Sequence, residues 1–485
     1  MATGNAGRQL QLISTYYDTT DRRLRQRGLV LRVRERNGRF VQTVKSDRQA
    51  DAGALARGEW EDRIRSPQPT PEARESGRFL TADIADELVP LFRTEVSREA
   101  IQLSPTPGTR IEAAIDRGRI CVPDRGAGEP ISEVELELKS GASSALYDLA
   151  LDLLAVTPLR LEPRSKAERG YRLAGRKSRR RPAPNFEAPE LDAGMSGDAA
   201  LRRIGIACLE RVLRNEALVR RRSAEGVHQM RVAVRWLRAI LSAFSPMLPR
   251  DQRRWASREL RWLANALGPA RNLDVFATTL VARAPPRLIE PGQLKVLSAA
   301  VVRRRRVAYT EAVGAIRSPR YTGMMLRLLR WFDTCAWQAE ESSEDLRQPI
   351  AILAARVLDR RLEMVKRRSI DFADQYPEQR HRLRIALKKL RYASEALAKL
   401  YDPEKVRPFV RRLKQLQDDL GEISDVRVAH HIVAELSGPD AAAIVEAGKR
   451  LVAWHEEGLE DHEPSLRSRV RELLEMEPFW QAGGS

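Results

Sequence analysis

The chain has little of what a secreted, redox-active or membrane-spanning protein needs. Its 485 residues include three cysteines, Cys121, Cys208 and Cys335, which lie far apart without Cys-x-x-Cys spacing. This pattern argues against a disulfide framework, a thiol centre or a zinc site and fits a reducing compartment. The N-terminus lacks an apolar stretch of signal-peptide length, and no segment approaches the roughly 20 apolar residues of a membrane span. We therefore expect a cytoplasmic protein.

Aromatic residues are also scarce, at 6% of the chain, which leaves few platforms on which nucleic-acid bases stack. Positive charge is abundant instead: 85 Lys and Arg against 66 Asp and Glu give a net charge of +19. Such an excess indicates a polyanionic partner, whether nucleic acid, polyphosphate or an acidic membrane surface. The length exceeds what one core organises, so we expect two or three units.

The first third of the chain favours short segments of period-2 alternation, broken by Gly and Asp. The clearest are residues 29–35, 39–45, 109–116 and 131–139, and they predict an antiparallel sheet or barrel. One face of these strands is charged. Arg32 and Arg34 share a face, and so does the series Glu133, Glu135, Glu137 and Lys139.

The composition changes near residue 175. A basic run at 176–181 and a Pro-rich stretch at 182–189 indicate a linker, after which long 3.6-period segments rich in Leu, Ala and Arg predict an all-α unit. We thus predict an α+β multidomain chain: a β unit at 1–174, a linker at 175–197 and a helical unit at 198–485, which consists of repeats at about 198–330 and 350–485.

The helical part contains a repeat with an offset of 153 residues. The segment that begins with His228 matches the one that begins with His381, with basic residues at offsets 3, 7 and 10 from each histidine. A second match, Leu267-Gly-Pro-Ala-Arg-Asn272 with Leu420-Gly-Glu-Ile-Ser-Asp425, keeps the same register. Two matches in one register indicate a duplicated helical unit.

On an α-helix, offsets 0, 3, 7 and 10 fall within an arc of about 80°, so each copy forms one basic stripe. Packed as a two-fold-related pair, the stripes line one cleft. Since neighbouring like charges destabilise a helix, such stripes imply an anionic ligand or acidic neighbours, for which Glu395 and Asp425 are candidates. The predicted polyphosphate-binding residues are His228, Arg231, Arg235, Arg238, His381, Arg384, Lys388 and Arg391.

Two simpler interpretations stay open. The stripes resemble solvated faces of amphipathic helices, although a solvated face gives no reason to keep histidine at the same offset twice. The histidines also fit core residues that bond a neighbouring helix. For the Leu-Gly segments the structural interpretation is preferred: Gly268 and Gly421 are predicted helix C-caps, followed by Asn272 and Asp425 as caps of the next helices.

The helical half resembles the CHAD family, the conserved histidine α-helical domains, from about Asp198 to Gly438. The resemblance implies two pseudo-symmetric bundles around a basic groove that binds inorganic polyphosphate, in some members at polyphosphate granules. Trp236 departs from the family's basic run, and Asn272 stands where Asp is usual. The matching segments are Val227-His-Gln-Met-Arg-Val-Ala-Val-Arg235, Leu267-Gly-Pro-Ala-Arg-Asn-Leu-Asp-Val275, His381-Arg-Leu-Arg-Ile-Ala-Leu-Lys-Lys-Leu-Arg-Tyr392 and Leu416-Gln-Asp-Asp-Leu-Gly421.

A β unit that carries both cations and carboxylates suits phosphate chemistry, because cations hold phosphate oxygens and carboxylates hold Mg²⁺ or Mn²⁺. A surface sheet with alternating ion pairs is the alternative for any single strand. The predicted phosphate-binding residues are Arg32, Arg34, Lys45, Arg98, Lys139, Lys166 and Arg169. The predicted metal ligands are Glu59, Glu61, Asp116, Glu133, Glu135 and Glu137.

This half resembles the CYTH family, the triphosphate tunnel metalloenzymes, from about Ser14 to Leu173. The resemblance implies an antiparallel tunnel barrel that hydrolyses triphosphates, most often inorganic triphosphate in this arrangement, with a divalent metal. The matching segments are Tyr16-Tyr-Asp-Thr-Thr-Asp21, Leu31-Arg-Val-Arg34, Gln42-Thr-Val-Lys45, Arg57-Gly-Glu-Trp-Glu61, Ile115-Asp-Arg-Gly118, Ile131-Ser-Glu-Val-Glu-Leu-Glu-Leu-Lys139 and Ser165-Lys-Ala-Glu-Arg-Gly-Tyr171.

The family's first strand, Glu-x-Glu-x-Lys, normally precedes the Tyr-Asp-Thr segment and is missing from this sequence. Either the start lies further upstream or the barrel lacks a strand, two carboxylates and a lysine, and we expect weak or no triphosphatase activity without them. The first hypothesis is a polyphosphate-binding protein with a triphosphatase-type barrel, located in the cytoplasm or at polyphosphate granules. The alternatives are a binding-only module with a vestigial barrel and a helical nucleic-acid-binding protein.

Overall fold

The computed structural model describes residues 8–49, 57–123, 125–175, 188–372, 375–436, 441–460 and 463–481. The chain divides into two compact units, Met1–Arg181 and Pro182–Ser485. The first, here called the sheet unit, is an antiparallel sheet with short helices, and the second, the helical unit, is almost entirely α-helical. The predicted α+β fold class is therefore confirmed. Most of the predicted linker lies outside the described residues.

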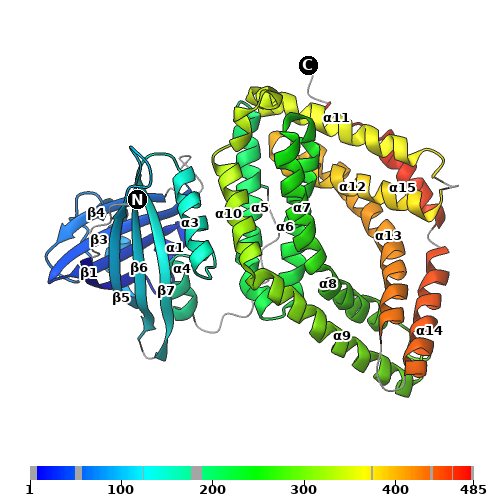
Figure 1. Ribbon diagram of the computed structural model, residues 1–485, viewed down its shortest axis with the longest axis horizontal. Helices are drawn as coiled ribbons and strands as arrows, with labels where there is room; N and C mark the ends of the chain where they lie inside the picture. The colour runs from blue at the N-terminus through cyan, green and yellow to red at the C-terminus, as the bar shows by residue number, and fades with distance from the viewer. Residues whose placement is uncertain are drawn as a thin grey trace. The chain divides into compact units, whose positions relative to one another are not determined.

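The sheet unit consists of seven antiparallel strands in the order β4-β3-β2-β1-β5-β6-β7 (Figure 1). The four segments with the clearest alternation form β2, β3, β6 and β7. Between β2 and β3 the chain reverses at Asn37 and Gly38, both with positive φ, as a two-residue hairpin requires. The strands are β1 (Arg8–Asp18), β2 (Leu29–Arg36), β3 (Arg39–Gln49), β4 (Arg57–Ile64), β5 (Val89–Leu103), β6 (Arg110–Val122) and β7 (Arg125–Ser140).

The sheet curls although its two edge strands do not pair within the described residues. The pKa of Lys139 on β7 is raised mainly by its hydrogen bond to Glu137, and Glu112 and Glu59 contribute as well. Because Glu59 lies on β4, at the opposite end of the strand order, its electrostatic effect on Lys139 indicates that the two edges lie near each other. The charged residues of the strands therefore face the inside of a curved, barrel-like sheet.

Short helices close one end of this curved face: α1 (Arg23–Gln26), α2 (Ala82–Ala85), α3 (Ser144–Val156) and α4 (Lys166–Ala174), with a 3₁₀ turn at Gly77–Phe79. Helix α4 begins with a capping box between Ser165 and Glu168. Its Gly170 packs so closely on Phe92 that a Cβ would lie 2.0 Å from the ring. The buried carboxylate of Asp18 accepts hydrogen bonds from Leu24 N and from Tyr171 Oη, which joins α1, α4 and β1. Together these contacts fix the position of α4 on the sheet.

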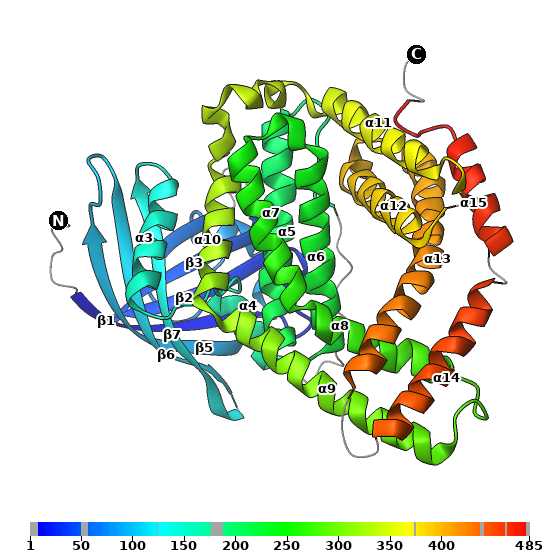
Figure 2. The ribbon, with the colours of Figure 1, turned by 45° about the vertical axis from the view of Figure 1, so that its right-hand side comes forward.

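The helical unit contains eleven α-helices among the described residues. Figures 1 and 2 both show α12 lying between α11 and α13, and α6 packs against α12. A π-helical turn at Phe276–Val281 follows α8. The helices are α5 (Gly197–Arg220), α6 (Ala224–Ala243), α7 (Arg250–Ala266), α8 (Gly268–Val275), α9 (Pro291–Arg317), α10 (Pro319–Asp333), α11 (Ile350–Ser369), α12 (Pro377–Leu397), α13 (Pro403–Glu435), α14 (Ala441–Glu460) and α15 (Glu463–Glu475). No described helix combines the length and the apolar character that crossing a membrane would require.

The 153-residue register of the sequence repeat extends to whole helices. Helices α11, α12 and α13 begin at residues 350, 377 and 403, each 153 residues after the first residues of α5, α6 and α7. The first residues of the duplicated helices thus agree in register, although their last residues do not. The duplicated unit therefore includes α5 and α11, in which the sequence alone shows no clear match.

The predicted helix caps at the Leu-Gly segments are wrong. Gly268 is the first residue of α8 and Gly421 lies inside α13, and neither has a positive φ. Asn272 and Asp425 lie within the same helices. The glycines instead provide room: a Cβ at Gly268 would lie 3.5 Å from Arg231 Nη1, and one at Gly421 would lie 3.8 Å from an Arg384 Nη. The second repeated motif thus packs against the first.

Candidate functional site

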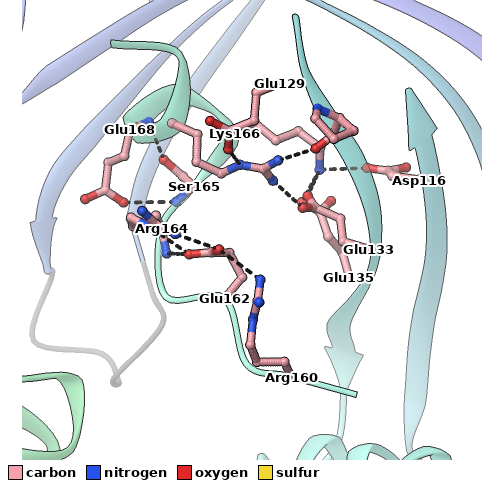
Figure 3. A network of polar contacts seen from close by, with 12 residues as sticks. Asp116, Glu129, Glu133, Glu135, Arg160, Glu162, Arg164, Ser165, Lys166 and Glu168 are labelled. Atoms are coloured by element: carbon pink, nitrogen blue, oxygen red, sulfur yellow. Dashed lines mark hydrogen bonds and ion pairs between the residues drawn. The ribbon is translucent and has the colours of Figure 1, made fainter. Parts of the chain in front are cut away.

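In the sheet unit, Lys166 holds three carboxylates together (Figure 3). Its Nζ lies 2.7 Å from Asp116 Oδ2, 2.5 Å from Glu133 Oε1 and 2.6 Å from Glu135 Oε1. Asp116 comes from β6 and the two glutamates from β7, while Lys166 is the first residue of α4. Three oxygens around one ammonium form a cage for a cation.

Two arginines extend this cluster. Arg98 donates two 2.7 Å hydrogen bonds to Asp116 and contacts Glu135, and Arg169 lies 2.7 Å from Glu133. Burial by itself would raise the pKa of Asp116, but hydrogen bonds from Arg98 and Lys166 outweigh it and lower that pKa. The carboxylates of the cluster are therefore ionised, and each is already paired with a cation of the same cluster.

The three carboxylates fit a divalent cation. One oxygen of each lies within 4.8 Å of the others, and an all-oxygen donor set is what Mg²⁺ and Mn²⁺ prefer. The remaining predicted ligands are not part of this group. Glu59 and Glu61 lie on β4, and Glu137 lies 2.6 Å from Lys139. Asp116, Glu133 and Glu135 are thus the residues that would hold the metal, and Lys166 lies where the metal would be.

The predicted phosphate-binding cations of the strands differ in how strongly they are compensated. Lys45 lies 2.7 Å from Glu59, and Arg32 lies 3.5 Å from Glu61. Arg34 is half-buried and donates to Ser14 Oγ at 3.2 Å, and among the described residues it has no carboxylate within ion-pair distance. Burial, followed by repulsion from Arg32, lowers its pKa to about 10. Arg34 is therefore the strand cation with the most capacity for an added anion.

In the helical unit, one predicted stripe lies on α6 and the other on α12, and the two stripes face each other. Tyr392 of α12 lies between them: its ring centre is 4.8 Å from the guanidinium of Arg391 and 6.0 Å from that of Arg235, and its ring lies 5.9 Å from that of Trp236. The stripes predicted from the sequence thus lie on α6 and α12 with Arg235, Arg384 and Lys388 close enough to repel one another. The sequence interpretation did not assign a role to Tyr392, although this residue ends the matching segment that begins with His381.

The stripes repel each other. Burial, then Arg384 on its own helix and Arg235 on α6, lower the pKa of Lys388 from 10.5 to about 7, with Arg231 acting in the same direction and Asp425 of α13 opposing. Burial also lowers the pKa of Arg231 to about 10. The low pKa of Lys388 thus reflects its burial first and the positive charge of its neighbours second.

The two histidines lie in the same positive electrostatic field as the basic stripes. Burial lowers the pKa of His228, and Arg271 and Arg235 lower it further, while burial followed by Arg384 and Arg427 lowers that of His381. His381 opens onto a pocket of about 510 Å³ that Arg427, Ser424 and His431 also line. These neighbours belong to the second repeated motif and to the helical turns that follow it. Their position beside His381 is visible only in the packing.

Acidic side chains compensate the stripes only in part. Arg391 lies 3.2 Å from Glu395, and Asp425 acts on Arg384 and Lys388. The Nε atoms of Arg235 and Arg384 and the hydroxyl of Tyr392 are buried without a hydrogen-bond partner in the described part of the chain. Buried donors without acceptors are costly, so this arrangement suits an incoming oxyanion with several oxygens.

Fold and sites together define a two-part protein, with a carboxylate and cation cluster in a curved sheet and facing basic helices in a duplicated bundle. Two family models match these two parts. The CYTH domain matches residues 2–171 and the CHAD domain matches residues 203–434. The chain therefore consists of a CYTH domain followed by a CHAD domain.

Individual relatives support both halves. The chain is similar to the inorganic triphosphatase of Haemophilus influenzae, with 31% identity over 171 residues, which cover 34% of this chain and 47% of the relative. An uncharacterized protein of Mycobacterium tuberculosis is 29% identical over 275 residues, 55% of this chain and 50% of its own length. The chain thus spans about half of each curated relative. The crystal structure of the CHAD domain from the plant Ricinus communis aligns at 29% identity with a TM-score of 0.53, covering 61% of this chain and 98% of that structure.

The position of Lys166 predicts competition with metal. In Lys166→Met the ammonium is gone while the carboxylates remain, so we expect Mn²⁺ to bind at least about tenfold more tightly, in line with the loss of about 1.5–3 kcal/mol of charge-assisted hydrogen bonding. Isothermal titration with Mn²⁺ measures the affinity. Thermal unfolding should show that the variant is less stable without metal and regains more stability with it than the parent does.

Lys139→Met is the matched control, because it removes a lysine that pairs with Glu137, outside the three-carboxylate group. Its Mn²⁺ affinity should stay within about twofold of the parent's, a difference of about 0.4 kcal/mol. Equal affinities in the parent and in Lys166→Met would show that Mn²⁺ does not use this position.

Proposed function

We propose that the protein binds inorganic polyphosphate on the helical unit through the two facing stripes. The observation that carries this proposal is the set of buried, unpartnered donors between α6 and α12, where the charges of Arg235, Arg384 and Lys388 repel one another. A chain of phosphates offers a negative charge and several acceptor oxygens at every repeat. It satisfies these donors and removes the repulsion in one step.

The same proposal assigns the sheet unit to phosphoanhydride hydrolysis, with inorganic triphosphate as the substrate. Support comes from the similarity to an inorganic triphosphatase and from the group formed by Asp116, Glu133 and Glu135. Mg²⁺ or Mn²⁺ at this position would neutralise charge on the phosphate and lower the pKa of a water molecule. Arg34 would hold a phosphate oxygen, because its charge is the least compensated among the strand cations named above.

A nucleic-acid-binding function is the second candidate, and the aromatic residues argue against it. Trp236 and Tyr392, which lie within the basic cluster, are 3% and 2% exposed. Neither ring has a free face on which a base could stack, although single-stranded nucleic-acid sites use such faces. Recognition of phosphate alone therefore fits the cluster better, and we propose polyphosphate granules in the cytoplasm as its location.

The two stripes should act as one site. Arg231→Ala with Arg235→Ala should weaken polyphosphate binding about as much as Arg384→Ala with Lys388→Ala, by at least about tenfold each, because each pair removes two charge-assisted contacts with the same ligand. The slope of log affinity against log salt should fall by about 1.4 units in each double variant. Isothermal titration with long-chain polyphosphate at several salt concentrations measures both quantities.

Arg254→Ala with Arg258→Ala is the matched control: it removes two exposed arginines at the same spacing on α7, and it should leave affinity within about twofold (about 0.4 kcal/mol) of the parent's. Duplex DNA should compete poorly for the bound polyphosphate. If both stripe variants bind like the parent, the stripes are solvated helix faces and the proposal is wrong.

Binding should tighten as the pH falls from 8 to 6. Between about pH 7 and 10 the free Lys388 amine is largely neutral, whereas a bound polyanion favours the ammonium, so binding takes up a proton. The histidines, whose pKa values lie below 6.5 in the free protein, add the same trend at lower pH. Affinity should rise by up to about tenfold per pH unit for each proton taken up.

Proton uptake is measured by titration in two buffers of different ionisation enthalpy. Lys388→Arg keeps the charge at every pH in this range and should remove the part of the dependence above pH 7. An unchanged pH profile in Lys388→Arg would assign the dependence to other groups.

The enzymatic part is tested by the release of orthophosphate from inorganic triphosphate. We expect slow release that requires Mn²⁺ or Mg²⁺, because the described residues place three carboxylates in one group, and we expect Glu133→Gln to abolish it. Release that persists in EDTA would contradict metal dependence. No release by the parent would favour the binding-only alternative.

A further inference from the structure

A second group of cations lies at the junction of α6, α11 and α12, outside the facing stripes except for Arg238. Arg361 and Arg368 are seven residues apart on α11, which places them on one face of the helix. Arg361 Nη2 donates to Ser242 Oγ of α6 at 3.1 Å, and Arg368 Nη1 donates to the carbonyl of Arg382 on α12 at 2.8 Å. We call Arg238, Arg361, Arg368 and Lys389 the junction cluster.

The junction cluster lacks acidic compensation. Among the described residues, no carboxylate lies within ion-pair distance of its four cations, and Arg361 Nε is buried without a hydrogen-bond partner. Burial lowers the pKa of Lys389, and repulsion from Arg361, Arg368 and Arg238 lowers it further. Cations that are desolvated and repel one another destabilise the free protein. An anion that binds among them offsets this cost and stabilises the protein.

A solvated helix face does not explain this cluster. Arg360 and Arg367, the neighbours of Arg361 and Arg368 in sequence, are exposed and can be hydrated, whereas the junction-cluster cations are half-buried. Arg361 and Lys389 therefore lose water without gaining a carboxylate. On the same helix, Arg360 and Arg367 thus carry ordinary hydrated surface charge, whereas Arg361 and Arg368 carry charge that is partly removed from water.

The duplication shows that the cluster is particular to the second repeat. At the offset of 153 residues, Arg361, Arg368 and Lys389 correspond to Cys208, Asn215 and Trp236 in the first repeat. All three counterparts are buried and uncharged. The junction cluster is thus an addition to one side of a two-fold arrangement.

Arg238 connects the junction cluster with the stripes. It lies one helical turn beyond Arg235 on α6, about 5 Å along the axis. Its charge acts on Arg231 in the stripe and on Lys389 in the junction cluster. A chain of phosphates that follows the α6 stripe therefore reaches the junction cluster without crossing a region of opposite charge.

We infer that the junction cluster is a further phosphate subsite, which extends the polyphosphate site beyond Arg238 at one end. This inference rests on the proposed binding of polyphosphate by the stripes. A chain long enough to span both clusters gains the added contacts with Arg361, Arg368 and Lys389. Inorganic triphosphate, which is short enough to stay on the stripes, does not gain them.

The test is a competition experiment on the full chain. Labelled long-chain polyphosphate is displaced by unlabelled long-chain polyphosphate or by triphosphate, for the parent and for Arg361→Gln with Lys389→Met. We expect the double variant to lose at least about tenfold in affinity for the long chain, with a salt slope lower by about 1.4 units. Triphosphate should keep its affinity within about twofold (about 0.4 kcal/mol). The sheet unit is the same in every variant, so phosphate bound there contributes equally.

Arg360→Gln with Arg367→Gln is the matched control, because it removes two exposed charges from α11 beside the cluster. An equal loss in this control, or an equal loss for triphosphate, would assign the effect to overall charge and overturn the inference. Arg368→Gln, whose side chain contacts a backbone carbonyl, is a milder second variant if the double variant unfolds; it should lose long-chain affinity alone, by about threefold or more (about 0.7 kcal/mol).

The same data separate this inference from the function on which it rests. If the parent binds long chains and the stripe variants do not, while the junction variants bind like the parent, the stripes are the whole site and the inference is wrong. If the parent binds neither phosphate, the proposed function fails as well. Length-selective loss in the junction variants supports both.

Discussion

The main physical constraint on the helical unit is the repulsion between cations that its fold holds close together. Packing of α6 against α12 brings Arg231 and Arg235 close to Lys388, and burial, followed by repulsion from Arg384 and Arg235, lowers the pKa of Lys388 to about 7. Each such contact works against the folded state of the free protein, so the apolar packing of the duplicated helices must outweigh it. A bound polyanion reverses the sign of these terms and stabilises the same arrangement.

In the sheet unit, by contrast, the clustered cations are neutralised by carboxylates. Its cations and carboxylates neutralise one another: Lys166 and Arg98 share Asp116 and Glu135, and Lys45 holds Glu59. A metal ion at the three carboxylates would therefore displace an existing partner, whereas an anion on the helical unit would meet donors such as Arg235 Nε and Arg384 Nε, which have no hydrogen-bond partner among the described residues. Because exchange of partners costs more than addition, the two clusters would differ in how readily they take up a ligand.

Much of this arrangement could be predicted from the sequence, because periodicity and register are local properties. Alternation predicted β2, β3, β6 and β7, and the repeated offsets predicted two basic stripes, whose residues lie on α6 and α12 and repel one another. What depends on long-range packing could not be predicted. The carboxylates of β4 and β7 look alike in the sequence but belong to different clusters, and Gly268 resembled a helix cap because its contact with Arg231 is 37 residues away. Lys389 was missed because it lies off the stripe by one residue.

The nature of the ligand explains why a duplicated site and a one-sided extension are compatible. A linear polyphosphate is chemically the same from either end, so a pseudo-two-fold site would bind it equally in both directions. An extension at one end therefore selects for length and imposes no direction on the chain. A nucleic-acid strand has a backbone with polarity, so its two orientations in such a site would differ in affinity. The one-sided extension at Arg361, Arg368 and Lys389 would thus add to the affinity for a long chain in either orientation of a polymer without polarity.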